Sequence, residues 1–274
     1  MAAILLAMDA QSNKDAPSLW LTVDQGNSAT KLVAWERSGG IASVLEHVTL
    51  SREELLAGGL GGSLARRDYQ GIAFSSVACR GDQDALVTSL GSGAHISRPD
   101  CGLVLAVRNP ETVGADRLFA ARGAVELARG SGALVVVDAG TALTVDCVRD
   151  GVFLGGAIAP GPALLSSALE SGGAQLFEVS PEPDAPALGR ETREALEAGV
   201  AVGFLGAAKE LVQRQIKDAA MQSGSPPTIF LTGGARRFLC VPEPFVEGEL
   251  VVDPELVHRG LLAALWSELE EGSS

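Results

Sequence analysis

Short apolar runs alternate with glycine-rich turns in the first part of the chain. Leu19–Gln25 and Thr30–Glu36 are rich in apolar and β-branched residues, and Ser43–Leu50 continues the pattern. Runs of this length, separated by turn residues, predict three strands. Ser51 is a good N-cap with Glu54 at the capping-box position, so a short helix is expected next.

The following segment adds a second group of elements. Gly71–Ala78 is typical of a buried strand, Asp82–Leu90 of a helix, and Leu103–Val107 of a further strand that leads to an Asn-Pro pair. The resulting order, βββαβα, is that of the repeated core of ribonuclease-H-like lobes. We therefore expect an α/β fold.

The pattern then begins again. A helix is predicted over Asp116 to about Arg129, followed by strands at Leu134–Asp138 and Ala142–Val148. Arg149-Asp150-Gly151 predicts a hairpin turn into the strand Val152–Ile158, because Asp-Gly favours tight turns between strands.

The last third of the chain favours long helices. Helices are predicted over Ala163–Glu170, from Glu191 to about Met221, and from Pro254 to about Glu270. The proline-rich segment Ser180–Leu188 predicts an extended loop, and Thr228–Leu231 a strand before a Thr-Gly-Gly turn.

One short pattern occurs twice. LTVDQGNSAT, at Leu21–Thr30, returns as VVVDAGTALT at Val135–Thr144, at a constant offset of 114 residues. The offset aligns Asp24 with Asp138, Gly26 with Gly140, Asn27 with Thr141, and Thr30 with Thr144. Each copy predicts a strand, a tight turn and an antiparallel return strand. We expect two similar lobes facing one cleft, with one hairpin per lobe gripping a nucleotide, as in actin-like phosphotransferases.

Composition narrows the classes of protein that remain. The chain has 274 residues and 46% hydrophobic residues, which suits two lobes of about 120 to 130 residues. The formal net charge of −13 disfavours general binding to nucleic acid. An anionic substrate must therefore meet locally placed positive charge.

The cysteine spacing and the lengths of the apolar runs indicate the cellular compartment in which the protein is expected. Cys79, Cys101, Cys147 and Cys240 show no CxxC spacing and favour buried thiols in a reducing cytosol over disulfides or a zinc site. No apolar run approaches the ~20 residues that span a membrane. Residues 1–18 are interpreted as an N-terminal extension, and the expected location is cytoplasmic.

The first hairpin loop offers the groups that phosphate chemistry needs. Asp24 can hold Mg²⁺, the small residues after it permit close approach of phosphates, and Lys31 supplies a cation. The alternative is an ordinary Asx-type turn, which the duplication makes a weaker explanation. In the second copy, Thr141 and nearby N–H groups could bind phosphates, and Asp138 could bind a cation.

For two further motifs, residue type alone leaves both a structural and a functional interpretation possible. Asp116 could cap a helix, worth about 1 kcal/mol, and Arg117 could pair with a carboxylate. Alternatively, Asp116 takes a hydroxyl proton while Arg117 holds a substrate anion. The Leu231–Ala235 turn could lie against adenosine or be an ordinary turn after a strand.

Taken in order, the motifs resemble those of type III pantothenate kinase. They are DxGN(S/T)xxK, GADR, DxGTAxTxD, Gly155–Gly161 as GGAIAPG, Gly189–Thr192 as GRET, LTGG, and a DPEL segment from Asp253. The ordered set covers roughly Leu19 to Leu262 and is specific as a set, although each motif alone is weak.

The resemblance implies phosphorylation of pantothenate by ATP, the first step of coenzyme A synthesis, in a homodimer. It implies two ribonuclease-H-like lobes of the acetate and sugar kinase/Hsc70/actin superfamily, here residues 19–113 and 114–274. The general base would be Asp116, and Asp138 would coordinate a monovalent cation, K⁺ or NH₄⁺. Mg²⁺ would accompany ATP, with Asp24 as its ligand. The ATP-binding residues would be Asp24, Gln25, Gly26, Asn27, Ser28, Ala29, Thr30, Lys31 and Thr141. The substrate-binding residues would be Val107, Gly114, Ala115, Asp116, Arg117 and Thr192.

The chain departs from the family at two positions. Val107 stands where the family commonly has a Tyr, and Phe177 where it has a Pro. The first change predicts weaker binding of pantothenate. It keeps open a kinase of another small alcohol, and a non-catalytic regulatory homologue is a further alternative. The retained Asp24, Lys31, Asp116, Asp138 and Thr141 favour an enzyme over a regulator.

Overall fold

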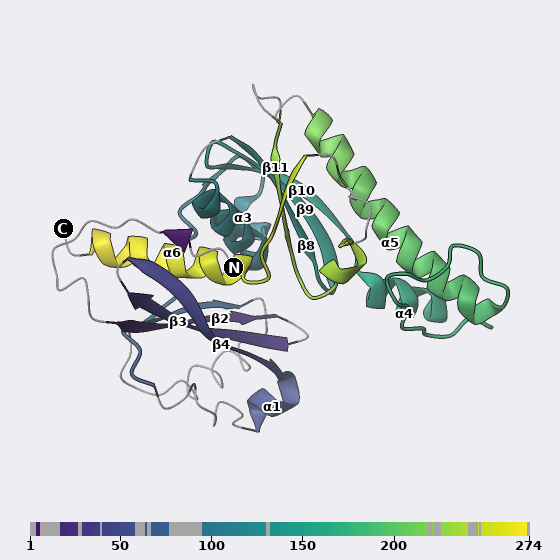
Figure 1. Ribbon diagram of the computed structural model, residues 1–274, viewed down its shortest axis with the longest axis horizontal. Helices are drawn as coiled ribbons and strands as arrows, with labels where there is room; N and C mark the ends of the chain where they lie inside the picture. The colour runs from purple at the N-terminus through teal and green to yellow at the C-terminus, as the bar shows by residue number, and fades with distance from the viewer. Residues whose placement is uncertain are drawn as a thin grey trace. The chain divides into compact units, whose positions relative to one another are not determined.

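The structure is a computed structural model with two compact α/β units (Figure 1). It describes residues 4–5, 17–26, 29–38, 40–57, 64, 67–76, 95–129, 132–218, 221, 226–240, 246 and 248–272. The first unit comprises Met1–Gly102, Thr112–Leu127 and Leu256–Ser274, and the second comprises Leu103–Glu111 and Ala128–Glu255. The helix expected at Asp82–Leu90 lies outside the described residues.

The first unit is built on a six-stranded sheet with the order β1-β4-β3-β2-β5-β6. The strands β1 to β4 pair antiparallel, whereas β2, β5 and β6 run parallel. Their bounds are Ile4–Leu5 for β1, Ser18–Gln25 for β2, Ala29–Ser38 for β3, Ile41–Ser51 for β4, Gly71–Ser76 for β5 and His95–Ser97 for β6. The expected strands before residue 77 are therefore confirmed.

Helices cover both faces of this sheet. The short helix α1 (Arg52–Leu56) begins at the predicted capping box of Ser51 and Glu54 and packs against β3 and β4. On the other face, α6 (Leu256–Glu271), yellow in Figure 1, packs against β2 and β5. The helix α3 (Ala115–Leu127) packs against α6.

The second unit repeats this plan with the order β12-β11-β8-β9-β10-β7. Its strands are β7 (Val104–Leu105), β8 (Ala133–Ala139), β9 (Ala142–Arg149), β10 (Val152–Pro160), β11 (Thr228–Thr232) and β12 (Glu249–Val252). The predicted Asp-Gly turn joins β9 to β10, with φ of 50° at Asp150 and 76° at Gly151. Positive φ at both residues is the geometry of the hairpin turn expected there.

Two helices cover one face of the second sheet. The long helix α5 (Thr192–Lys217) packs against β8, β9 and β10, and α4 (Pro162–Gly172) packs against α5 and β10. Phe204 and Val212 of α5 are buried against Val137 and Leu143 of the sheet. No helix in the described ranges is long and apolar enough to cross a membrane.

Five strands of the two sheets correspond, whereas the edge strands differ, because β1 is antiparallel to β4 and β7 is parallel to β10. Matching β2 with β8 also matches β3 with β9, β4 with β10, β5 with β11 and β6 with β12. In both units the first three strands are antiparallel and the next two are parallel. The expectation that the repeated sequence pattern forms equivalent hairpins is confirmed.

Candidate functional site

The first hairpin joins β2 to β3 at the end of the run that carries Asp24. Asp24 pairs with Lys31, and Gln25 pairs with Thr30. The turn is closed by a hydrogen bond of 3.0 Å from Gly26 N to Ala29 O. Asn27 and Ser28, which belong to the predicted nucleotide loop, lie outside the described residues.

The side chains of this hairpin divide between the two faces of the sheet. Residues paired across strands share a face, so Lys31, Asp24 and Ser75 of β5 form one row. Gln25 and Thr30 belong to the opposite face, where their exposed fractions are only 1% and 2%. The Ser76 hydroxyl donates to Gln25 Oε1 at 2.8 Å. Because these side chains are buried, Gln25 and Thr30 would contact a nucleotide through their backbone atoms.

The second hairpin has a shorter turn. Asp138 pairs with Thr144, and Ala139 pairs with Leu143. Gly140 N donates to Ala142 O at 2.9 Å. The turn is one residue shorter than the first, so Thr144 stands at the place of Lys31 and not of Thr30. The expected alignment of Thr30 with Thr144 at one constant offset is wrong beyond the turn.

Glycines from two later motifs pack against the second turn. A methyl group at Gly161 would collide with the carbonyl oxygens of Gly140 and Thr141, and one at Gly233 would collide with Asp138 Oδ1 and Ala139 O. Gly233 also has a φ of 93°, which glycine adopts without strain. The sequence showed these two glycines as parts of motifs, but their position beside the turn comes from the structure.

Backbone hydrogen bonds fasten the same turn on both sides. Gly161 N donates to Thr141 O at 3.0 Å, and Ala235 N donates to Ala139 O at 2.7 Å. The Thr141 side chain itself is exposed. The second hairpin is thus a fixed loop with an accessible hydroxyl and a half-buried carboxylate.

Asp146 is a candidate site residue for which sequence analysis predicted no role. It is 1% exposed and lies two residues after Thr144 in β9, so it shares a face with Asp138. A methyl group at the facing Gly156 would collide with Asp146 Oδ1. Its position as the final Asp of the DxGTAxTxD motif was the sequence signal that could have identified Asp146.

The GADR motif forms the start of α3. Asp116 Oδ1 accepts a hydrogen bond of 2.9 Å from Arg117 N, and a methyl group at Gly114 would lie 2.5 Å from the same oxygen. The carboxylate folds back over Gly114, so a larger residue there would displace the Asp116 side chain. Gly114, Ala115, Asp116 and Arg117 are all partly accessible. They are close together because they are consecutive in the chain, and their partial exposure leaves them open to a ligand.

Two predicted substrate residues belong to the second unit. Val107 follows β7 and is half-buried, and a methyl group at Gly155 would be 3.4 Å from its Cγ1. Gly155 has a φ of 105° and lies at an irregularity in the pairing of β10. Thr192 is the first residue of α5 and is exposed.

The three cysteines in the described part of the chain form no disulfide, but not all of them are buried. Cys101 and Cys147 are buried, whereas Cys240 is exposed, which corrects the expectation for that residue. Burial raises the pKa of the Cys147 thiol to about 12, with Asp146 and Asp218 adding to the effect. Cys79 lies outside the described residues.

The donors at the hairpins suit hard cations. No three His, Cys, Asp or Glu side chains gather as metal ligands in the described parts of the chain. Mg²⁺ in nucleotide sites needs only one or two carboxylates beside the phosphates, so Asp24 fits that use. Around Asp138, the half-buried carboxylate and the turn carbonyls provide oxygen donors, and Gly233 packs closely against the carboxylate.

Comparison with known proteins identifies a family. The profile of the type III pantothenate kinase family matches residues 20–214. The type III pantothenate kinase of Desulfatibacillum aliphaticivorans is 39% identical over 137 residues, 49% of this chain and 51% of that protein. That of Porphyromonas gingivalis is 33% identical over 251 residues, 88% of this chain and 95% of that protein. The chain thus spans about half of the first relative and nearly all of the second.

A solved structure supports the fold. The Campylobacter jejuni protein described as a conserved Baf family transcriptional activator has a TM-score of 0.57 and 24% identity, covering 91% of this chain and 99% of that one. At this identity the likeness concerns the fold alone. The predicted class, two lobes of the acetate and sugar kinase/Hsc70/actin superfamily, is confirmed by the family match and by the two matching sheets.

Proposed function

Because the chain belongs to the type III pantothenate kinase family, we propose that it transfers the γ-phosphoryl group of ATP to the primary alcohol of pantothenate. The product is 4′-phosphopantothenate, and the reaction opens coenzyme A synthesis. The observation that carries the proposal is the family match over residues 20–214, within which Asp24, Lys31, Asp116, Asp138 and Thr141 are all retained.

The first hairpin is assigned to the phosphates of ATP. Lys31 is paired with Asp24 across the strands, so a cation and a carboxylate stand side by side at the turn. The ammonium group offsets phosphate charge, and Asp24 binds the Mg²⁺ that accompanies ATP. The residues from Gln25 to Thr30 complete this nucleotide loop.

The second hairpin is assigned to phosphate and to a monovalent cation. The exposed Thr141 hydroxyl donates to phosphate, and Asp138 with neighbouring carbonyl oxygens holds a monovalent cation, K⁺ or NH₄⁺. The support is the accessible carboxylate beside a turn whose backbone is fixed by Gly161 and Ala235. When bound, the cation supplies positive charge next to the triphosphate.

The start of α3 is assigned to the acceptor. The pantothenate hydroxyl oxygen attacks the γ-phosphorus in line, the bond to the β–γ bridging oxygen breaks, and ADP leaves. The hydroxyl proton passes to the Asp116 carboxylate. Arg117 holds the pantothenate carboxylate, and Gly114, Ala115, Thr192 and Val107 complete the substrate contacts.

A homodimer is proposed on the surface of the second unit. Ile158 of β10, Leu164 of α4 and Val202 of α5 are 64%, 44% and 47% exposed, and these elements pack against one another. Exposed apolar side chains on adjoining elements favour association. We also propose a cytoplasmic location, where ATP and free thiols such as those of Cys101 and Cys147 belong.

The test is an ADP-release assay coupled to NADH oxidation, with purified protein, ATP, Mg²⁺ and K⁺. Pantothenate is compared with a panel of other small alcohols. The proposal predicts the highest kcat/KM with pantothenate. Turnover of another alcohol alone would favour the second candidate, an actin-fold kinase of different specificity, which Val107 suggests. No turnover with any alcohol, in a protein that still binds ATP, would favour a regulatory homologue.

A further inference from the structure

We propose that α6 is a positioning element for phosphoryl transfer, in which Gly260 and His258 fix the Asp116 helix relative to the strand that presents Asp24. The inference rests on the proposed function, because it concerns the same reaction. All of its parts belong to the first unit. Neither Gly260 nor His258 is placed in contact with a substrate.

Glycines allow α3 and α6 to touch through their backbones. A methyl group at Gly260 would collide with Phe119 O, and one at Gly123 would collide with Leu256 O. The same virtual methyl group at Gly260 would lie only 3.0 Å from Gly123 N. Phe119 is one helical turn after Asp116, so Gly260 lies against the turn that follows the proposed base.

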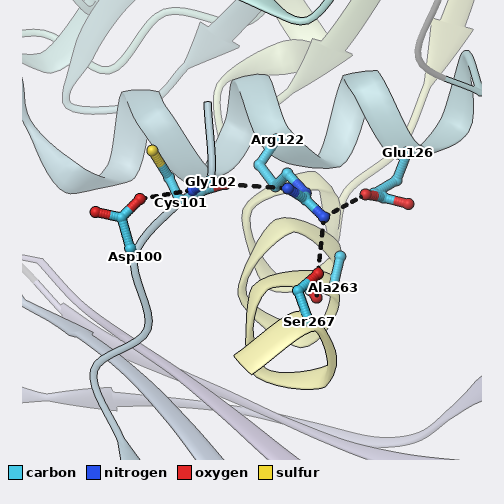
Figure 2. Close-up of polar contacts among 7 residues, drawn as sticks. All are labelled: Asp100, Cys101, Gly102, Arg122, Glu126, Ala263 and Ser267. Carbon is cyan, nitrogen blue, oxygen red and sulfur yellow. Dashed lines mark hydrogen bonds and ion pairs between the residues drawn. The ribbon is translucent and has the colours of Figure 1, made fainter. Parts of the chain in front are cut away.

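A partly buried guanidinium holds the same two helices together further along (Figure 2). Arg122 of α3 donates from Nη2 to Ser267 Oγ of α6 at 3.1 Å, and it pairs with Glu126 at 2.7 Å. Its Nη1 donates to Cys101 O at 3.4 Å. The two helices are therefore attached at the glycine contact and again at Arg122, so the direction of α3 is set by α6.

The start of α6 is anchored to β2 by a polar group in an otherwise apolar interior. His258 is 2% exposed, and its Nδ1 lies 2.9 Å from Thr22 Oγ1. Trp35 Nε1 donates to the same hydroxyl at 2.8 Å. Thr22 precedes Asp24 by two residues in a regular strand, so the two side chains share a face.

The second unit lacks this device at the matching place. Thr22 corresponds to Val136 of β8, which is 1% exposed and apolar. An apolar residue at the place of Thr22 is therefore compatible with this sheet plan, although its cross-strand partner there is the buried Asp146. Burying Thr22 and His258 instead costs desolvation energy, which indicates a selected geometry rather than a general requirement of the fold.

The decisive experiment is a double-mutant cycle between Gly260→Ala and Asp116→Asn. Gly260→Ala is expected to lower kcat roughly 10- to 100-fold while the Kd for ATP stays within about twofold. If Gly260 acts through Asp116, the two changes together lower kcat much less than the product of their separate effects. Gly206→Ala in α5, where a methyl group meets nothing within 4 Å, is the matched control.

A merely structural role would give a different result. Loss of folded protein would lower the rate by the same factor in both backgrounds, so multiplicative effects would overturn the proposal. Thermal melts of each variant set the assay temperature below unfolding. Absence of turnover in the unmodified protein would instead contradict the proposed function, so the two failures are distinguishable.

A second pair of variants decides the matter if Gly260→Ala does not fold. His258→Leu and Thr22→Val remove the hydrogen bond without a backbone collision, and each is expected to lower kcat roughly three- to tenfold. The double variant should be no slower than the worse single one, and its loss should shrink in the Asp116→Asn background. Unchanged kcat in both single variants would contradict the anchoring role of His258.

Discussion

The two hairpins share their strand plan and differ in what surrounds the turn. In the first, Asp24 is paired with Lys31, and the turn has one residue more. In the second, Asp138 is paired with Thr144, and Gly161 N and Ala235 N bind the carbonyls of the turn. The repeated pattern thus keeps one aspartate in place while changing its electrostatic neighbour.

This difference supports the different tasks proposed for the two aspartates. A carboxylate beside an ammonium group suits a nucleotide with its divalent ion, because the pair offsets both phosphate and metal charge. A carboxylate beside a hydroxyl and fixed carbonyl oxygens suits a weakly charged cation. The fold provides two equivalent positions, and we propose that local substitutions decide which ion each one takes.

The largest effect is expected outside both hairpins. Asp116→Asn keeps the shape of the side chain but removes the proposed base, so kcat should fall roughly 10²- to 10⁴-fold with ATP binding largely kept. Glu111→Gln, at an exposed carboxylate shortly before α3, is the control. Steady-state kinetics with pantothenate measures both. Unchanged turnover would reduce Asp116 to a helix cap and place the proton acceptor elsewhere.

The next prediction compares the two residues paired with the aspartates. Lys31→Met removes a charge-assisted contact, so KM for ATP should rise roughly 10- to 100-fold. Thr144→Val, at the matching place in the second hairpin, should change KM for ATP by less than about threefold. Initial rates over a range of ATP concentrations give both values. Equal effects would mean that the two hairpins treat the phosphates alike.

A third prediction concerns the buried His258 and the pH dependence of stability. Burial, with Lys31 and His47 adding to it, lowers the pKa of His258 from 6.5 to about 3. As pH falls from about 6.5 toward 3, the unfolded chain takes up a proton that the folded protein does not. The free energy of unfolding should therefore fall by about 1.4 kcal/mol per pH unit from this group, and the contribution is complete above pH 6.5.

The comparison for that prediction is the double variant Thr22→Val with His258→Leu, which imitates the apolar Val136 of the second sheet. Urea unfolding between about pH 6 and pH 4 should show a shallower loss of stability in the variant. Parallel pH profiles for the two proteins would show that His258 is accessible to protons in the folded state.

The smallest effect is expected at the pantothenate contacts. Val107→Tyr adds a hydroxyl and an aromatic wall, so KM for pantothenate should fall roughly three- to tenfold with kcat nearly unchanged. Val104→Tyr, at a side chain 66% exposed in β7, is the control. A higher KM in Val107→Tyr would indicate that the pocket has been rebuilt around valine and would favour another alcohol as substrate.

Local sequence signals were sufficient for most elements of the fold. The capping box at Ser51 and the Asp-Gly turn at Asp150 involve only neighbouring residues, and both form as expected. The strand β12 was not predicted, because a four-residue run gives little periodicity. The packing of α6 on β2 was not predicted either, since it joins residues far apart in the chain.

The candidate site likewise divides into features with a local sequence signal and features that depend on residues far apart in the chain. Motifs pointed to both aspartates and to Asp116, but a constant offset could not reveal that one turn is shorter. The pair of Thr22 and His258 was missed because Thr22 appears as a single hydroxyl in an apolar run, and His258 stands beside Arg259 with no signal of a distant partner. Only the register of the strands and the position of α6 bring these two together.

The central claim is that Lys31 of the first hairpin supplies the positive charge for the phosphates and Asp138 of the second binds the monovalent cation. Isothermal titration of ATP with Mg²⁺, in K⁺ and then in Na⁺ buffer, tests it on three proteins: the unmodified chain, Lys31→Met and Asp138→Asn. We predict that Na⁺ weakens ATP binding at least about fivefold in the first two and has no effect in Asp138→Asn. A cation effect that survives in Asp138→Asn and disappears in Lys31→Met would contradict the account.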